Sequence, residues 1–175
     1  MLVYLEDILP EGIEVEVCLD PDDPAVRELS VKGPVKGTLQ INRLGEHVLV
    51  RGSVSGEVEL TCARCLRDFS SRIEEEVDVE LRPVLDLQGA AQERELGSDD
   101  LDVEFFSGDA LDIGHLAAEQ ISLCIPMKPL CREDCGGICP DCGIDRTSGT
   151  CECKPDTDPR WSALKDLKDR MKQNR

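Results

Sequence analysis

Six cysteines crowd into residues 131–153 of this 175-residue chain, in the order Cys131, Cys135, Cys139, Cys142, Cys151 and Cys153. The central two stand in the turn sequence Cys-Pro-Asp-Cys-Gly. Four thiolates suit a tetrahedral metal ion, with zinc–sulfur bonds of about 2.3 Å, and a Cys-x-x-Cys turn places two sulfurs on one ion. The spacing therefore predicts a metal knuckle centred on Cys139 and Cys142, followed by a tight turn that Gly143 permits.

The spacing leaves the other ligands of this knuckle open. Either the first two or the last two cysteines of the segment would complete four sulfurs around one ion. A further Cys-x-x-Cys pair, Cys62 and Cys65, lies far upstream, and it would form a second site if the fold brought it to the pair left over. Because a lone Cys-x-x-Cys is not specific, a reduced structural pair is an equally good interpretation of Cys62 and Cys65.

One or two zinc ions per chain are expected. Iron is less favoured, because nothing in the sequence indicates an electron-transfer protein, although four thiolates would suit it as well. The cysteine-rich segment has no histidine and no adjacent acid–base pair, so it lacks the open position of a catalytic zinc site. No nucleophile–base set or phosphate-binding loop is found either. The metal is predicted to be structural, and the protein is not expected to be an enzyme.

Runs of alternating apolar and polar residues predict the strands that position these cysteines. We expect strands over residues 13–19, 35–44 and 47–54, and on both sides of the Cys62–Cys65 turn, at 58–62 and 73–83. Gly45-Glu46 would join two of them as a hairpin. Short strands in succession favour an antiparallel sheet, one that could curl toward a barrel, over parallel βαβ units. With five aromatic residues in the chain, the core should consist of Val, Leu and Ile.

Two helices are expected beside the sheet, which makes the fold α+β. Asp112 is placed to cap a helix that Pro126 ends. Asp158-Pro159 is placed to begin a second helix. The second helix would have the apolar stripe Trp161, Leu164, Leu167 and Met171. Residues 86–111 lack periodicity and are predicted to be a mobile acidic connection.

The sequence divides into three parts: a β-rich core with the acidic connection and one helix at 1–125, a cysteine knuckle at 126–155, and an amphipathic basic helix at 156–175. A single main core is expected at this length. The chain does not open on a basic and apolar leader, and no run approaches the ~20 apolar residues of a membrane span. A cytoplasmic location, with reduced thiols and no membrane contact, is therefore expected.

The chain is strongly acidic, with a formal net charge of −17, and residues 74–112 hold 14 acidic and 2 basic side chains. Phosphate backbones would be repelled, whereas a basic protein partner would be attracted, although a solvated acidic face is the plainer interpretation. Residues 160–175 carry a net charge of +4, which suits a helix C-terminus and also offers a phosphate contact. Candidate RNA or partner contacts are Arg64, Arg160, Lys165, Lys168, Arg170 and Lys172.

Five blocks of the sequence together resemble the YceD family, the large ribosomal RNA subunit accumulation proteins of bacteria and plastids. The blocks are Cys62–Leu66, Ile125–Cys131, Cys135–Gly143, Cys151–Cys153 and Asp158–Lys168. The order and spacing of these blocks match the family, and so does their composition. The chain departs from the family at Asp145-Arg146, where Asn-Leu is common after the knuckle.

The resemblance implies a non-enzymatic cytoplasmic factor that supports processing or accumulation of large-subunit ribosomal RNA. It also implies a basic large-subunit ribosomal protein or a pre-ribosomal particle as the partner, because family members are often encoded beside such a protein. RNA contact would fall to the basic C-terminal helix. Two other functions fit the residues: a thiol redox protein using Cys62 and Cys65, and a zinc-ribbon adaptor in a regulatory complex. The redox pair would lie between antiparallel strands rather than at a helix N-terminus, where thiol pKa values fall.

Overall fold

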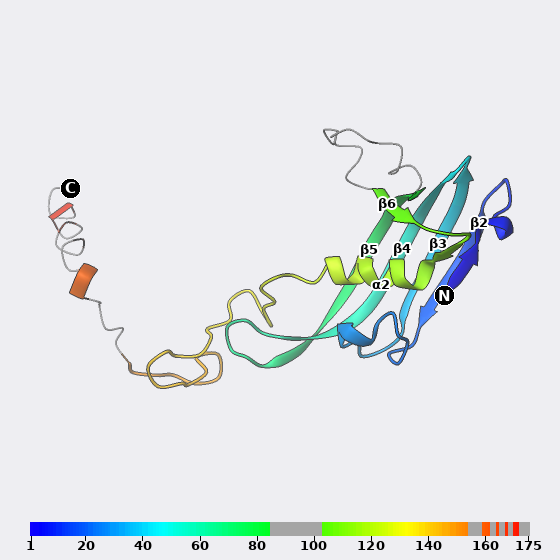
Figure 1. Cartoon of the computed structure of the whole chain (residues 1–175). Helices are drawn as coiled ribbons and strands as arrows, with labels where there is room; N and C mark the ends of the chain where they lie inside the picture. Colours follow the sequence, from blue (N-terminus) through cyan, green and yellow to red (C-terminus); the bar gives the residue numbers. More distant parts are fainter. Residues whose placement is uncertain (85–102, 154–158, 162–163, 165–166, 168–169, 172–175) are drawn as a thin grey trace. The chain divides into compact units, whose positions relative to one another are not determined.

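The computed structural model describes residues 1–84, 103–153, 159–161, 164, 167, 170 and 171. Its strands are β1 (Leu2–Tyr4), β2 (Ile13–Leu19), β3 (Val35–Leu44), β4 (His47–Thr61), β5 (Asp68–Pro83), β6 (Val103–Phe106) and β7 (Ala110–Asp112). The α-helix α2 covers Ile113–Leu123, and single 3-10 turns lie at Leu5–Asp7, Arg27–Leu29 and Pro159–Trp161. The main sheet has the strand order β2-β3-β4-β5-β6, and β1 pairs with β7. Helix α2 lies along one face of the main sheet (Figure 1).

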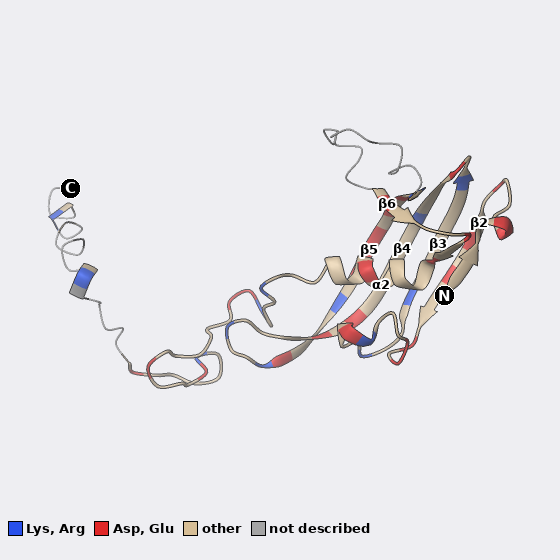
Figure 2. Ribbon diagram, in the orientation of Figure 1, with Lys and Arg blue, Asp and Glu red and all other residues tan. Residues whose placement is uncertain are grey.

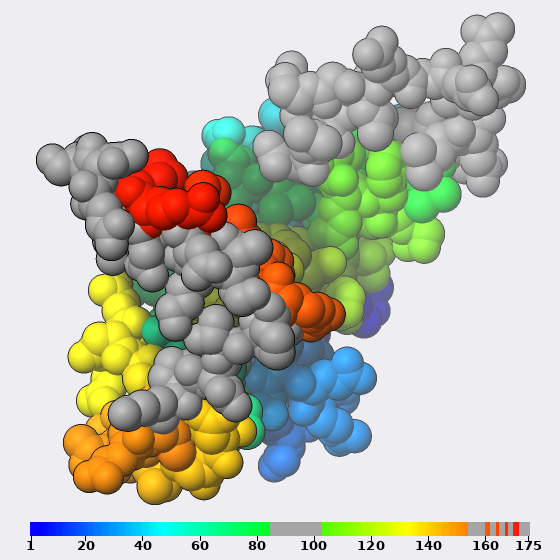
Figure 3. Space-filling model, turned by 90° about the vertical axis from the view of Figure 1, so that its left-hand side faces the viewer, coloured from blue at the N-terminus to red at the C-terminus, as the bar shows by residue number. Residues whose placement is uncertain are grey.

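The chain forms two compact units. The first, Met1–Cys62 with Arg67–Cys131, contains both sheets and α2. The second, Ala63–Leu66 with Arg132–Arg175, contains most of the cysteine-rich segment. The part of this unit from residue 132 to 153 is yellow to orange in Figure 3. The boundaries expected at residues 125 and 155 stay predictions.

The predicted strands of the first unit are confirmed. Strands β2 and β3 have the expected bounds, and the turn between β3 and β4 falls at Gly45-Glu46, where Gly45 has a φ of 70°. Strands β4 and β5 are longer than the alternation indicated, and they pair antiparallel from Val48↔Leu81 to Thr61↔Asp68. The Cys-Ala-Arg-Cys segment is therefore the tip of a long hairpin.

The core is built from aliphatic side chains, as the scarcity of aromatic residues predicted. One face of the sheet contributes Val50, Val54 and Val77, and α2 covers them with Leu116 and Ile121. The sheet and the helix each have an apolar face, and each buries that face by packing against the other. Helix α2 begins as expected, because the Asp112 carboxylate accepts the His115 N–H at 3.1 Å.

Three expectations about the fold are wrong in whole or in part. The sheet is open rather than a barrel, since β2 and β6 are its two edges. It is also not wholly antiparallel, because β6 pairs parallel to β5. Part of the acidic connection, residues 103–106 and 110–112, forms strands, whereas residues 85–102 lie outside the described residues.

Of the second predicted helix, the described residues Leu164, Leu167, Arg170 and Met171 are helical, and the residues between them lie outside the described part of the chain. A single 3-10 turn lies where the second helix was expected to begin. Of its apolar stripe, Trp161 is 59% and Leu164 54% exposed. A short helix is marginal in water unless its apolar face packs on a partner, so this exposed stripe adds little stability to the helix.

Candidate metal centre

The structure gathers eight of the ten cysteines into two groups of four. Cluster 1 consists of Cys62, Cys65, Cys131 and Cys135, and cluster 2 of Cys139, Cys142, Cys151 and Cys153. Within each cluster the four sulfur atoms lie within 4.8 Å of one another. The alternative left open by the spacing is thus resolved in the fold: the knuckle pair meets the last two cysteines, and the hairpin pair meets the first two.

Cluster 1 is built on the tip of the β4–β5 hairpin. The Cys62 N–H donates to the Arg67 carbonyl at 2.9 Å, which closes the turn. Leu66, next to it, has a φ of 58°, a left-handed conformation that residues other than glycine seldom adopt. Cys62, Cys65 and Cys135 are all at most 4% exposed. All four residues lie in the second unit or directly beside it in the sequence.

Arg64 ties this turn to the segment that carries Cys135. Its guanidinium donates to the Cys135 carbonyl at 3.1 Å and to the Glu133 carbonyl at 3.3 Å. Its own carbonyl accepts the Ile138 N–H at 3.0 Å. A Cβ on Gly137 would lie 3.1 Å from that carbonyl oxygen, and Gly137 has a φ of 68°, so glycine is required there. RNA contact by Arg64 stays a prediction, and these bonds give the side chain a local structural role.

Cluster 2 is held by the turn that the sequence indicated. The Cys139 N–H donates to the Ile144 carbonyl at 2.8 Å. Gly143 has a φ of 73° and donates its N–H to the Cys139 carbonyl at 2.9 Å. Cys139 is 1% exposed, whereas Cys142 is exposed at the tip of the turn. The tight turn thus points both sulfurs of the knuckle to one place.

The electrostatics of cluster 2 favour a bound cation. The N–H groups of Cys142 and Asp141, together with the Arg146 guanidinium 3.3 Å from the sulfur, lower the pKa of Cys139 to about 6. The pKa of Cys153 is raised to about 12 by its hydrogen bond to Cys142, by burial and by the neighbouring sulfur charges. One thiolate therefore opposes ionisation of the next. A divalent cation would remove that repulsion.

Both clusters fit a tetrahedral tetrathiolate site. Four sulfurs at about 2.3 Å from one ion lie about 3.8 Å apart, well inside the 4.8 Å limit that both clusters satisfy. All eight donors are cysteine sulfur, a set that zinc and iron both accept. With all four positions taken by protein, such a site staples loops rather than activating water.

The comparisons with known proteins identify the family of this chain. The family profile described as "Large ribosomal RNA subunit accumulation protein YceD" matches residues 50–168, a span that includes every residue of both clusters. The chain belongs to the YceD family. No solved structure matches it. In the part of the chain that the structure describes, no helix has the length and apolar character of a membrane span.

Mycobacterial proteins are among the relatives of this YceD family member. Uncharacterized proteins of Mycobacterium tuberculosis and Mycobacterium bovis are each 30% identical to it over 129 residues, which cover 74% of this chain and 59% of the relative. An uncharacterized protein of Mycobacterium leprae is 25% identical over 134 residues, covering 77% and 59%. The chain spans about three fifths of the length of these relatives.

The other predicted site residues either belong to neither cluster or lie outside the residues that the structure describes. Arg160 and Arg170 are exposed, and Lys165, Lys168 and Lys172 lie outside the described residues. Cys18 and Cys124 belong to neither cluster. Burial and the Glu75 carboxylate raise the pKa of Cys124 to about 11, so it is a neutral thiol.

Arg146 is a residue at cluster 2 whose contact the sequence reasoning missed. It stands seven residues after Cys139. A cation placed one turn beyond a knuckle was an available signal. Its guanidinium is close enough to hydrogen-bond the Cys139 sulfur.

Replacing Arg146 with leucine should lower the zinc affinity of cluster 2 about tenfold, the lower end of the range for lost hydrogen bonds to metal ligands. Competition against a chromophoric zinc chelator measures this effect. The Arg146→Lys variant is the matched control, because it keeps a positive charge near Cys139. Equal affinity in the wild-type and Arg146→Leu proteins would show that the contact is incidental.

Proposed function

We propose that this protein is a non-enzymatic accessory factor in biogenesis of the large ribosomal subunit. It supports processing or accumulation of large-subunit ribosomal RNA by docking a basic ribosomal protein or a pre-ribosomal particle in the cytoplasm. The observation that carries the proposal is the YceD family match over residues 50–168. The basic residues near the C-terminus are the candidate contacts to RNA.

The charge of the protein supports docking to a basic partner. Strand β5 presents Glu74, Glu76 and Asp78 on the face that alternates with the core side chains. Figure 2 shows acidic residues along this strand. With a net charge of −17, the protein would accelerate its encounter with a cationic partner by long-range attraction.

Zinc in both clusters completes the proposal. Among its described residues, the second unit has few buried apolar side chains other than cysteine, and metal–sulfur bonds would take their place in holding its loops. Elemental analysis of the reduced, untagged protein distinguishes zinc from iron. Zinc is preferred because four thiolates without an evident redox partner are typical of structural zinc sites.

The redox alternative receives less support from the geometry. A redox-active Cys-x-x-Cys presents an accessible thiolate, whereas Cys62 and Cys65 are 0% and 4% exposed. Both sulfurs also have Cys131 and Cys135 within 4.8 Å, so they belong to a four-sulfur group rather than an isolated pair. This arrangement favours a metal ligand over a dithiol catalyst.

The function is tested in a host lacking its own family member. Expression of this chain should restore the ratio of large- to small-subunit ribosomal RNA, and the protein should co-sediment with large-subunit precursors at low salt. Because exposed charges are screened beyond about 8 Å at 0.15 M salt, co-sedimentation should fall as salt rises.

Charge reversal supplies the matched variants for this experiment. The double variant Glu74→Lys/Glu76→Lys should reduce co-sedimentation, whereas Glu14→Lys/Glu16→Lys, on the exposed side of β2, should leave it nearly unchanged. Normal ribosomal RNA in the empty host, or binding indifferent to salt and to both variants, would contradict the proposal.

A further inference from the structure

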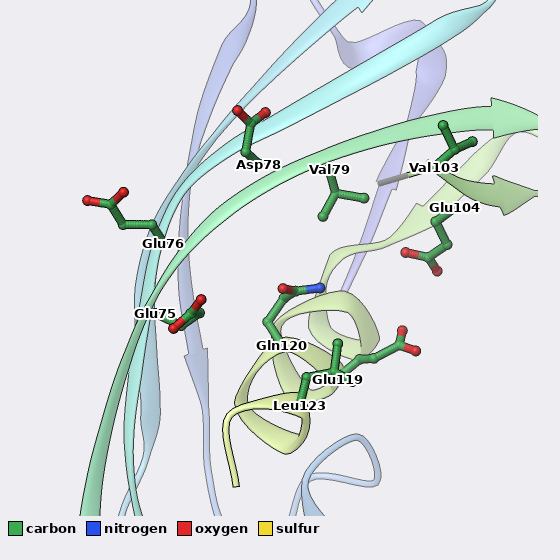
Figure 4. A pocket seen from close by; sticks show the side chains of 9 residues that line it. All are labelled: Glu75, Glu76, Asp78, Val79, Val103, Glu104, Glu119, Gln120 and Leu123. Atoms are coloured by element: carbon green, nitrogen blue, oxygen red, sulfur yellow. The ribbon is translucent and has the colours of Figure 1, made fainter. Parts of the chain in front are cut away.

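A groove of about 550 Å³ lies between α2 and strands β5 and β6 (Figure 4). Of the residues that the structure describes, five carboxylates, one amide and three apolar side chains line it, and no basic side chain does. It belongs wholly to the first unit and is separate from both cysteine clusters. The metal sites therefore do not account for it.

Two of the groove carboxylates occupy positions on the covered side of the sheet. Glu75 pairs with Val54, and Glu104 pairs with Leu81. Paired residues on neighbouring strands point to the same face, and Val54 and Leu81 are buried on the face that α2 covers. Apolar residues at these positions would extend the core. A carboxylate at either position lowers the stability of the fold, a cost that is typical of residues with a role in binding.

The negative charge of the groove is poorly compensated. Burial raises the pKa of Glu104, the Glu119 carboxylate on α2 raises it further, and His115 lowers it. Among the described residues, no Lys or Arg forms an ion pair with Glu104 or Glu119. Glu75 accepts a hydrogen bond from the neutral Cys124 thiol. An incoming cation would relieve this repulsion.

The spacing of the carboxylates discriminates between possible cations. A calcium ion gathers its oxygen ligands at about 2.3–2.6 Å around one point. In the described part of the chain, the groups of three or more ligand atoms within 4.8 Å of one another are the two cysteine clusters, and no carboxylates join them. The carboxylates of the groove are too far apart to bind one metal ion together. Their spacing suits several cationic side chains along one peptide.

The groove also offers apolar contact. Leu123, at the end of α2, is 72% exposed, and Val79 and Val103 line the groove with it. We propose that this groove binds an amphipathic basic segment of a partner protein, whose Lys or Arg side chains meet Glu104 and Glu119 and whose apolar side chains cover Leu123. The inference rests on the proposed docking function and names the surface and the chemistry of its partner.

The test uses the whole 175-residue chain, purified with zinc, and a synthetic helical peptide with leucines on one face and lysines on the other. Fluorescence anisotropy should show saturable binding that weakens about tenfold in Glu104→Gln/Glu119→Gln, the combined loss of two ion pairs. Leu123→Ala should weaken it several-fold. The matched control Glu14→Gln/Glu16→Gln removes the same charge from β2 and should change the affinity less than twofold.

Amide chemical shifts of the wild-type protein give a second readout that needs no variant. Perturbations on adding the peptide should concentrate at Val79, Val103 and Gln120. A peptide with glutamates for lysines, and a short single-stranded RNA, should not bind the groove. No saturable binding of the lysine peptide, equal losses in the groove and β2 variants, or perturbations elsewhere would overturn the inference.

Co-sedimentation separates this inference from the proposed function. If the wild-type protein and Glu104→Gln/Glu119→Gln both co-sediment with large-subunit precursors, the groove is not the contact and the function stands. If the peptide binds in the groove but the wild-type protein does not co-sediment, the docking function fails and the groove remains a peptide site.

Discussion

Replacing Cys135 with serine is expected to remove one of two zinc ions per chain and to unfold the turns that cluster 1 holds together. Cys135 is 3% exposed and shares cluster 1 with Cys62, Cys65 and Cys131. Structural zinc contributes on the order of 10 kcal/mol to the folding of small metal domains, and three sulfurs bind the ion much more weakly than four. The loss of zinc affinity at cluster 1 should exceed the ~10–100-fold that follows when a metal ligand loses a hydrogen-bond partner.

The first unit should survive this substitution. Its buried cluster consists of aliphatic side chains from the sheet and α2, and none of the cluster 1 or cluster 2 cysteines belongs to it. Far-UV circular dichroism should therefore keep its strand signal. Limited proteolysis should cut the cysteine-rich segment while sparing the sheet.

Cys18→Ser is the matched control, because Cys18 is exposed on β2 and belongs to neither cluster. It should keep the full zinc content and the wild-type protease pattern. If Cys135→Ser retains two zinc ions and resists protease like the wild type, cluster 1 is a reduced structural group. Visible absorption from thiolate–iron bonds, together with iron in elemental analysis, would instead identify the metal as iron.

Local patterning predicted the antiparallel strands well, because alternation over 13–19 and 35–44 reflects one buried face. It failed at β6, which is four residues long and too short to show a period. That strand also pairs parallel to β5, and such long-range pairing leaves no mark in local sequence. The barrel prediction failed for the same reason, since closure depends on which strands become edges.

The cysteines were identifiable by type, but their grouping was not. Spacing along the chain leaves the partners of Cys62 and Cys65 undetermined, since a hairpin tip can meet any later segment. The fold joins them to Cys131 and Cys135 through contacts such as the Arg64 guanidinium on the Cys135 carbonyl. The groove was equally inaccessible, because Glu104 shares a face with Leu81 only through the unexpected register of β6.

Helix α2 provides the second large expected effect. Ile121→Ala should lower the free energy of unfolding of the first unit by about 2–5 kcal/mol, because Ile121 is 0% exposed and its removal leaves a cavity between helix and sheet. Urea denaturation followed by circular dichroism measures this, and an unchanged m-value would show that the transition stays two-state. A loss below about 1 kcal/mol would mean that α2 is not firmly packed.

Leu123→Ala, two residues along the same helix, is the matched comparison. Leu123 is 72% exposed, so its truncation should change stability by no more than about 0.5 kcal/mol. The same substitution should weaken binding of the lysine–leucine peptide, because Leu123 lines the groove. Ile121 thus holds α2 against the sheet, whereas Leu123 is placed to contact a segment bound in the groove. Stability and binding should separate on one helix, and losing both together at Leu123 would mean that the leucine serves the fold rather than a partner.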